Sequence, residues 1–189
     1  MTRPAAKGWC PGAYRPMHSG DGLIVRIRPH FARLSAEQAL GLSQVSQRFG
    51  NGTIDLTSRS NLQIRGILET DYDALMTELE ALKLLDEAPE IEARRNILVA
   101  PDWTQADESY ALTTALTRQL GALPALPTKF GFAVDTGNAP MLTAASADIR
   151  IERDLSGALL LRADGAALGR PVTGETAVET VLDLSLIHI

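Results

Sequence analysis

Cysteine is almost absent from this chain, which has one such residue, Cys10, among 189. A single thiol cannot form an intrachain disulfide, and it cannot supply the cysteine thiolates that hold an iron–sulfur cluster. The chain has three histidines, and His18 and His30 have no acidic or cysteine partners at the spacing of a metal site. The residues themselves therefore predict no metal site.

Long apolar runs are also missing, since no stretch approaches the roughly 20 residues of a membrane span. The first seven residues include Arg3 and Lys7, but no apolar segment of the kind found in signal peptides follows them. We therefore expect a cytoplasmic protein with no membrane partner. The net charge of −5 argues against general nucleic-acid binding, which usually requires a basic surface. Apolar residues make up 45% of the chain, enough for one large core or two small ones.

Hydrophobic periodicity predicts an α/β (α+β) fold. In the first half, strands over 23–28, 53–57 and 61–67 alternate with two helices, in the order strand, helix, strand, strand, helix. Ser35 and Gln38 form a capping box that begins the first helix, and Gly50 ends it. Asp71 is expected to cap the second helix, which extends to about residue 85. This order is most of a ferredoxin-like plait.

The second half is expected to be a separate domain. The pattern predicts a helix over about 107–120, strands over 126–135, 147–153 and 158–163, and a helix that begins near residue 173. Between the two halves, the hydrophobic periodicity is interrupted by Pro89, by the arginine pair at 94 and 95, and by Pro101. We therefore expect domains at 1–88 and 89–183. The last six residues, 184–189, match one reading frame of a transposon-end sequencing adaptor, and we expect a non-native tail on a truncated chain.

Polar residues occupy every odd position from 59 to 65. The odd positions carry Arg59, Asn61, Gln63 and Arg65, whereas Leu62 and Ile64 are apolar. Side chains alternate across a strand, so one face would present guanidinium and amide groups. Arg26 or Arg28 would join this row if the strand registers match. The row is either an ordinary solvated sheet face or a surface that binds a ligand with several carboxylates, which arginine can hold bidentately.

Three segments, in order, resemble the nitrite/sulfite reductase superfamily. Thr57-Ser-Arg59 with Gln63 and Gly66 is similar to T-x-R-x-x-x-Q-x-x-G, Arg95-Asn96-Ile-Leu to R-N-V-x, and Leu126-Pro-Thr-Lys129-Phe to L-P-R-K-F-K. The resemblance implies a ferredoxin-like half-domain followed by the start of the superfamily's catalytic domain. It implies active-site roles for Arg59, Arg95 and Lys129, with Asn61, Gln63, Arg65 and Asn96 as further cofactor-binding candidates.

The sequence also departs from the superfamily pattern. Arg65 stands where a histidine is common, and Gly131 stands where a second lysine follows K-F. Loss of that lysine weakens the interpretation as a reductase of a small anion, whose reduction requires concentrated positive charge.

The N-terminal segments point to one branch of the superfamily. Cys10-Pro-Gly, Pro16-Met and Ser19-Gly-Asp-Gly-Leu resemble the precorrin-3B synthase family of aerobic cobalamin biosynthesis. That resemblance implies a monooxygenase that hydroxylates a tetrapyrrole, precorrin-3A, and closes a lactone with electrons from a donor. It also implies a 4Fe–4S cluster, whose ligands are absent from this chain, and leaves non-haem iron or sirohaem open.

Two alternatives remain at this point. The first is a sirohaem-dependent sulfite or nitrite reductase of the same superfamily. The second is a non-catalytic plait domain that binds a protein or an RNA through its open sheet face. An RNA-binding sheet would expose aromatic side chains on its strands as stacking surfaces, and the expected strands 23–28, 53–57 and 61–67 contain none.

Overall fold

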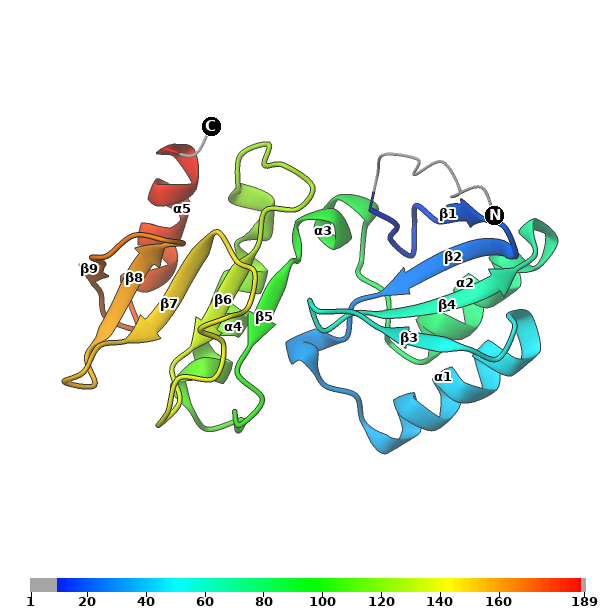
Figure 1. Cartoon of the computed structure of the whole chain (residues 1–189), viewed down its shortest axis with the longest axis horizontal. Coiled ribbons are helices and arrows are strands. Elements are labelled where there is room, and N and C mark those ends of the chain that lie inside the picture. The colour runs from blue at the N-terminus through cyan, green and yellow to red at the C-terminus, as the bar shows by residue number, and fades with distance from the viewer. Residues whose placement is uncertain (1–9, 188–189) are drawn as a thin grey trace. The chain divides into compact units, whose positions relative to one another are not determined.

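The computed structural model describes residues 10–187 and divides into two compact units, with the division between Ala93 and Arg94. Unit 1 precedes this point and unit 2 follows it. Figure 1 shows a sheet with helices on one face in each unit, which confirms the α/β class. None of the helices in residues 10–187 combines the length and the apolarity of a transmembrane span.

Unit 1 is an antiparallel sheet of four strands in the order β1-β2-β4-β3. Its elements are β1 (Met17–Ser19), β2 (Gly22–Ile27), α1 (Ala36–Phe49), β3 (Ile54–Leu56), β4 (Leu62–Ile67), α2 (Tyr72–Ala81) and α3 (Pro89–Arg94), with 3-10 turns at His30–Ala32 and Glu69–Asp71. The predicted strands and the first two helices are all present, and β1 and α3 are additional. Proline is tolerated at the first position of a helix, so Pro89 begins α3 here.

The core of unit 1 lies between the sheet and the two longer helices. Val25, Ile27 and Ile64 from the strands are fully buried, as are Leu75 and Leu79 from α2. The core-facing residues of the two central strands, Leu23, Val25 and Ile27 on β2 and Leu62, Ile64 and Ile67 on β4, are all apolar. The opposite face carries the polar residues discussed below.

The two predicted helix caps have different outcomes. Ser35 accepts a hydrogen bond from the Gln38 N–H at 3.1 Å, and the Gln38 side chain accepts one from the Ser35 N–H at 3.0 Å, so the capping box is confirmed. Asp71 makes no capping hydrogen bond with its side chain, so that prediction is wrong. An N-cap residue is normally extended, whereas Asp71 has φ −100° and ψ −5° because it ends the preceding 3-10 turn.

A buried carboxylate holds the N-terminal loop of unit 1. Glu92 on α3 is 5% exposed, and its side chain accepts hydrogen bonds from the N–H groups of Ala13, at 2.6 Å, and Tyr14, at 3.3 Å. The Tyr72 hydroxyl donates to the Ala13 carbonyl, and the Tyr14 hydroxyl donates to that of Asp86. Burial, reinforced by the charge of Glu92, raises the pKa of both tyrosines above the ordinary 10.0.

Unit 2 contains a mixed sheet in the order β5-β6-β7-β8-β9. Its elements are β5 (Ile97–Val99), α4 (Glu108–Arg118), a 3-10 turn at Leu120–Ala122, β6 (Phe132–Asp135), β7 (Ile149–Arg153), β8 (Leu159–Ala163), β9 (Arg170–Pro171) and α5 (Ala177–Ile187). β5, β6 and β7 are parallel, and the outer pairs β7–β8 and β8–β9 are antiparallel. Figure 1 shows α4 and α5 together on one face of this sheet.

The connection from β6 to β7, residues 136–148, is held by two charged side chains of the sheet. Arg150 is 2% exposed and donates to the carbonyls of Leu142 and Ala145, while its Nε lies 2.8 Å from Asp164 Oδ1. Asp135 accepts hydrogen bonds from the N–H groups of Met141 and Leu142. Both partners of each interaction belong to unit 2, so these charges stabilise the local path of the chain.

The second-half predictions are confirmed for most elements, with one clear difference. Residues 126–131, expected to be part of a strand that continues to Asp135, have no regular structure, and β6 begins at Phe132. The backbone of this irregular segment is hydrogen-bonded instead by side chains from neighbouring strands, as described next. The helix α5 extends to Ile187 and therefore includes part of the segment expected to be non-native.

Candidate functional site

The amino edge of the unit 2 sheet brings together three of the residues predicted to be functional. Because β5, β6 and β7 are parallel, the residues that precede them, Asn96, Gly131 and Asp148, lie along one edge. Arg95 immediately precedes Asn96, and Lys129 lies two positions before Gly131. Arg95 is 6% exposed, whereas the Lys129 side chain is exposed.

Asn96 holds the segment that carries Lys129. Its side-chain amide donates to the carbonyls of Thr128, at 3.1 Å, and Phe130, at 3.0 Å, on either side of the lysine. The main-chain carbonyl of Asn96 accepts a hydrogen bond from the Phe132 N–H at 2.8 Å. Asn96 therefore orders the backbone around Lys129, a role additional to the ligand contact expected from the sequence.

Asp148 is a residue of this edge that the sequence reasoning missed. Its carboxylate accepts the N–H of Gly131 at 2.8 Å, and its own N–H donates to the Gly131 carbonyl at 2.7 Å. The carboxylate is therefore bonded to a peptide that lies two residues beyond Lys129. No spacing rule singled it out, because its significance comes from the pairing of β6 with β7.

The structure separates the roles of the adjacent arginines. Arg94 donates through Nη1 to the carbonyls of Leu120 and Gly121, both at 3.1 Å. These carbonyls lie just beyond the C-terminus of α4, where a cation interacts favourably with unpaired carbonyls and with the helix dipole. Arg94 therefore has a structural contact within unit 2.

In unit 1, Arg59 lies in a hairpin loop rather than in a strand. Thr57 and Asn61 close this loop, since the Thr57 N–H donates to the Asn61 carbonyl at 2.9 Å and the Asn61 N–H to Thr57 Oγ1 at 3.2 Å. Ser60 has a φ of 54°, the left-handed conformation that three-residue hairpin loops require. The expectation that Arg59 and Asn61 continue the alternation of a strand is therefore wrong, because β4 begins at Leu62.

The polar row on β4 has closer partners than the sequence indicated. Arg26 is opposite Gln63 in the register of β2 and β4, and Asp55 is opposite Gln63 on β3. The Gln63 side chain, with its oxygen towards Arg26, accepts hydrogen bonds from Nε at 3.0 Å and from Nη2 at 2.6 Å. Arg65 forms an ion pair with Asp55. The missed residue is Asp55, which neutralises part of a row that had been expected to present only arginine and amide side chains.

The predicted residues thus form two groups, each within its own unit. Arg59 and Asn61 share the hairpin loop of unit 1, and Gln63 and Arg65 follow them on β4. Arg95, Asn96 and Lys129 belong to unit 2. Asn61 and Gln63 are nearly buried, at 8% and 9% exposure, so their side chains offer little surface to a ligand within unit 1.

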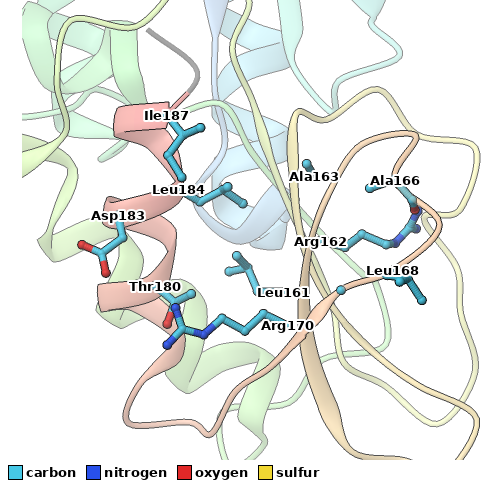
Figure 2. Close-up of a pocket in the computed structure, with 11 residues that line it drawn as sticks. Leu161, Arg162, Ala163, Ala166, Leu168, Arg170, Thr180, Asp183, Leu184 and Ile187 are labelled. Atoms are coloured by element: carbon cyan, nitrogen blue, oxygen red, sulfur yellow. The ribbon is translucent and has the colours of Figure 1, made fainter.

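Two cavities of unit 2 are lined by other residues. A groove of about 330 Å³ lies between β8, β9 and α5, and leucines 161, 168 and 184 are among its lining residues (Figure 2). A more polar cavity of about 540 Å³ is lined by side chains that include Asp135, Glu152 and Arg162. Within residues 10–187, no cluster of three or more histidine, cysteine or acidic side chains could hold a metal ion.

Comparison with known families identifies unit 1. Residues 15–82 match the family described as the nitrite/sulfite reductase ferredoxin-like half domain. Unit 1 carries this half domain. The matched residues, 15–82, cover the strands β1 to β4 and the helices α1 and α2 of unit 1.

Individual relatives extend the similarity beyond the half domain. The chain is 32% identical over 148 residues to a precorrin-3B synthase of a Sinorhizobium species, covering 77% of this chain and 32% of the relative. It is 30% identical over 141 residues to a ferredoxin–nitrite reductase of Synechococcus elongatus, covering 68% and 27%. It is 28% identical over 100 residues to the hemoprotein beta-component of an NADPH sulfite reductase of Staphylococcus saprophyticus, covering 51% and 18%.

A solved structure supports the fold of both units. The NirA protein of Mycobacterium tuberculosis has a TM-score of 0.64 and 19% identity, covering 87% of this chain and 34% of that protein. The chain is therefore a relative of the nitrite/sulfite reductase superfamily, whose members named here are oxidoreductases. It spans about a third or less of the length of these curated relatives.

The residues present do not fit a 4Fe–4S cluster. Such a cluster is held by cysteine thiolates, and this chain has one cysteine. Arginine and lysine side chains suit a ligand rimmed by carboxylates instead, because they hold carboxylates through charge-assisted hydrogen bonds. The chemistry available here is anion binding and orientation.

Proposed function

We propose that this chain is part of an oxidoreductase that acts on a tetrapyrrole with a carboxylate rim, and that within the superfamily it is of the precorrin-3B synthase type. Within unit 2, Arg95 and Lys129 would bind carboxylates of the macrocycle and orient it. Arg59 is the candidate anion contact of unit 1. Asn61, Gln63, Arg65 and Asn96 would order the backbone and the side chains around those cations. The electron donor and any iron cofactor would be bound by residues outside this chain.

The observation that carries the proposal is the composition of the amino edge of unit 2. One exposed lysine and one nearly buried arginine share this edge with Gly131 and with the carboxylate of Asp148. Reduction of a small anion requires several positive charges aimed at one point, and a carboxylate bonded to Gly131, two residues beyond Lys129, opposes that concentration. A large ligand with separated carboxylates requires only single cations at intervals. The 32% identity to a protein named precorrin-3B synthase supports the same choice.

The glycine at 131 is compatible with this arrangement for a steric reason. A Cβ atom at this position would lie 3.3 Å from the Asn96 carbonyl oxygen, which is already bonded to the Phe132 N–H. A side chain at 131 would therefore press on the β5–β6 pairing. Glycine keeps this pairing and leaves the edge beside Lys129 open to a bulky ligand.

Binding of a stable tetrapyrrole tests the proposal. Uroporphyrin, a flat macrocycle with carboxylates around its rim, should bind to the purified chain with a shift of its Soret band. Arg95→Met and Lys129→Met should each weaken binding by about 10- to 100-fold, since a hydrogen bond to a charged group contributes about 1.5–3 kcal/mol. Arg48→Met is the matched control, because Arg48 lies on α1 and pairs with Glu78. A cationic porphyrin that bound equally well would contradict the proposal.

The sirohaem-dependent sulfite or nitrite reductase is the second candidate, supported by the two reductases at 30% and 28% identity. Titration of the chain with sirohaem and with uroporphyrin distinguishes the two. Much tighter binding of sirohaem, lost on Arg95→Met and Lys129→Met, would favour the reductase. The non-catalytic RNA-binding alternative is disfavoured because the strands β2, β3 and β4 of unit 1 carry no aromatic side chain on which a base could stack.

A further inference from the structure

The segment that carries Lys129 is held from both sides. β6 lies between β5 and β7, and residues 126–131 enter it without regular structure. On one side, the Asn96 amide binds the carbonyls of Thr128 and Phe130. On the other, Asp148 binds both the N–H and the carbonyl of Gly131.

We infer that Asp148 is a positioning residue for Lys129, an inference that rests on the proposed function. Its carboxylate does not need to touch the ligand. It fixes the peptide of Gly131, two residues beyond the lysine, and so restricts the directions in which Lys129 can project. Asn96 performs the same task on the preceding carbonyls.

The physical reason is the cost of ordering a lysine on binding. A lysine on an irregular, unrestrained segment loses backbone and side-chain freedom when it binds a carboxylate. A segment that is already held by hydrogen bonds has lost much of that freedom on folding. The negative charge of Asp148 would by itself weaken binding of an anion, so its presence at this edge is better explained by the bond of its carboxylate to the Gly131 N–H than by electrostatics.

The substitutions Asp148→Ala and Asp148→Asn separate these effects. Both remove the negative charge, but asparagine keeps an oxygen that can accept the Gly131 N–H. Asp148→Ala should weaken binding of uroporphyrin by about three- to tenfold, the cost of ordering one long side chain. Asp148→Asn should bind at least as well as the original protein. Equal binding by the two variants would overturn the inference, since only the charge would then matter.

A double-substitution cycle tests whether Asp148 acts through Lys129. In the Lys129→Met background, Asp148→Ala should change binding less than twofold, because no lysine remains to be positioned. The same loss in both backgrounds would overturn the inference and leave the proposed function intact. If Lys129→Met alone had no effect, the role of Lys129 in the proposed function would fail, and the inference with it.

Amide hydrogen exchange gives a readout that requires no ligand. Asp148→Ala should accelerate exchange at Gly131 by at least tenfold while the amide of Ala133, inside β6, keeps its protection. Asp148→Asn should restore most of the protection at Gly131. Unchanged exchange at Gly131 in Asp148→Ala would show that the carboxylate does not hold this peptide, and would overturn the inference whatever the binding data.

Discussion

The buried carboxylate of Glu92 offers the sharpest test of how the N-terminal loop is held in unit 1. Glu92→Ala would remove the acceptor of the Ala13 N–H, bonded at 2.6 Å, and that of the Tyr14 N–H, bonded at 3.3 Å. Ala13 is 2% exposed, so water cannot readily replace the lost acceptor. The substitution would leave a buried donor without its partner, which is the costly way to lose a hydrogen bond.

The magnitude follows from these two contacts. Hydrogen bonds to charged groups contribute about 1.5–3 kcal/mol, and an unsatisfied buried donor costs about 1–3 kcal/mol. The Ala13 bond is short and buried, whereas the Tyr14 bond is long and only partly buried. We therefore expect Glu92→Ala to lower the free energy of unfolding of unit 1 by about 2–4 kcal/mol. This is a large part of the 5–15 kcal/mol typical of a domain.

Residue-level hydrogen exchange is the suitable assay, because two units need not unfold in one transition. The Ile64 amide lies in the central strand β4, and its side chain is fully buried. Its exchange should accelerate by about 30- to 1000-fold in Glu92→Ala, since each 1.4 kcal/mol is a factor of ten. Glu92→Gln, which keeps one oxygen acceptor, should show less than half of this free-energy change. Unchanged exchange at Ile64 in Glu92→Ala would refute the reasoning.

Three further outcomes are expected. Gly66→Ala should lower the urea midpoint by an amount equivalent to about 1–3 kcal/mol, since Gly66 has a φ of 74° and its added Cβ would lie 3.0 Å from Asn51 Cβ; an unchanged midpoint would contradict this. Ser35→Ala removes half of the capping box and should cost about 0.5–2 kcal/mol, measured by thermal unfolding, with Ser35→Asp as the control that keeps an acceptor. The raised pKa of Tyr72 means that the folded state retains the proton longer than the unfolded state does. The stabilisation is complete below pH 10.0, the ordinary pKa of tyrosine, and is lost as the pH rises through the raised pKa of Tyr72. Tyr72→Phe should therefore make the loss of stability at alkaline pH less steep, as measured by urea titrations at pH 9 to 12, values around the ordinary pKa.

Periodicity and local stereochemistry predicted most of the elements of both units, but not β1, α3, β5 or β9. The capping box at Ser35, the apolar stripes of α1 and α2, and the alternating strands β2 and β4 depend on interactions within a few residues. Such interactions join residues at a fixed spacing along the chain, so they can be predicted from the sequence without knowledge of the tertiary structure. The motifs around Arg59, Arg95 and Lys129 were likewise found in the sequence, and the match of residues 15–82 to the half domain agrees with the first of them.

Only the tertiary structure showed which polar groups face one another. Asp55 opposes Gln63 and pairs with Arg65 because of the register of β3 and β4, and Asp148 reaches Gly131 because β7 lies beside β6. In each pair the partners come from different strands, and no periodic pattern specifies their distance. The sequence by itself determined the elements and the cationic candidates. Strand pairing decided which of these charges are neutralised and which backbone segments are held, because hydrogen bonds between strands depend on register rather than on position along the chain.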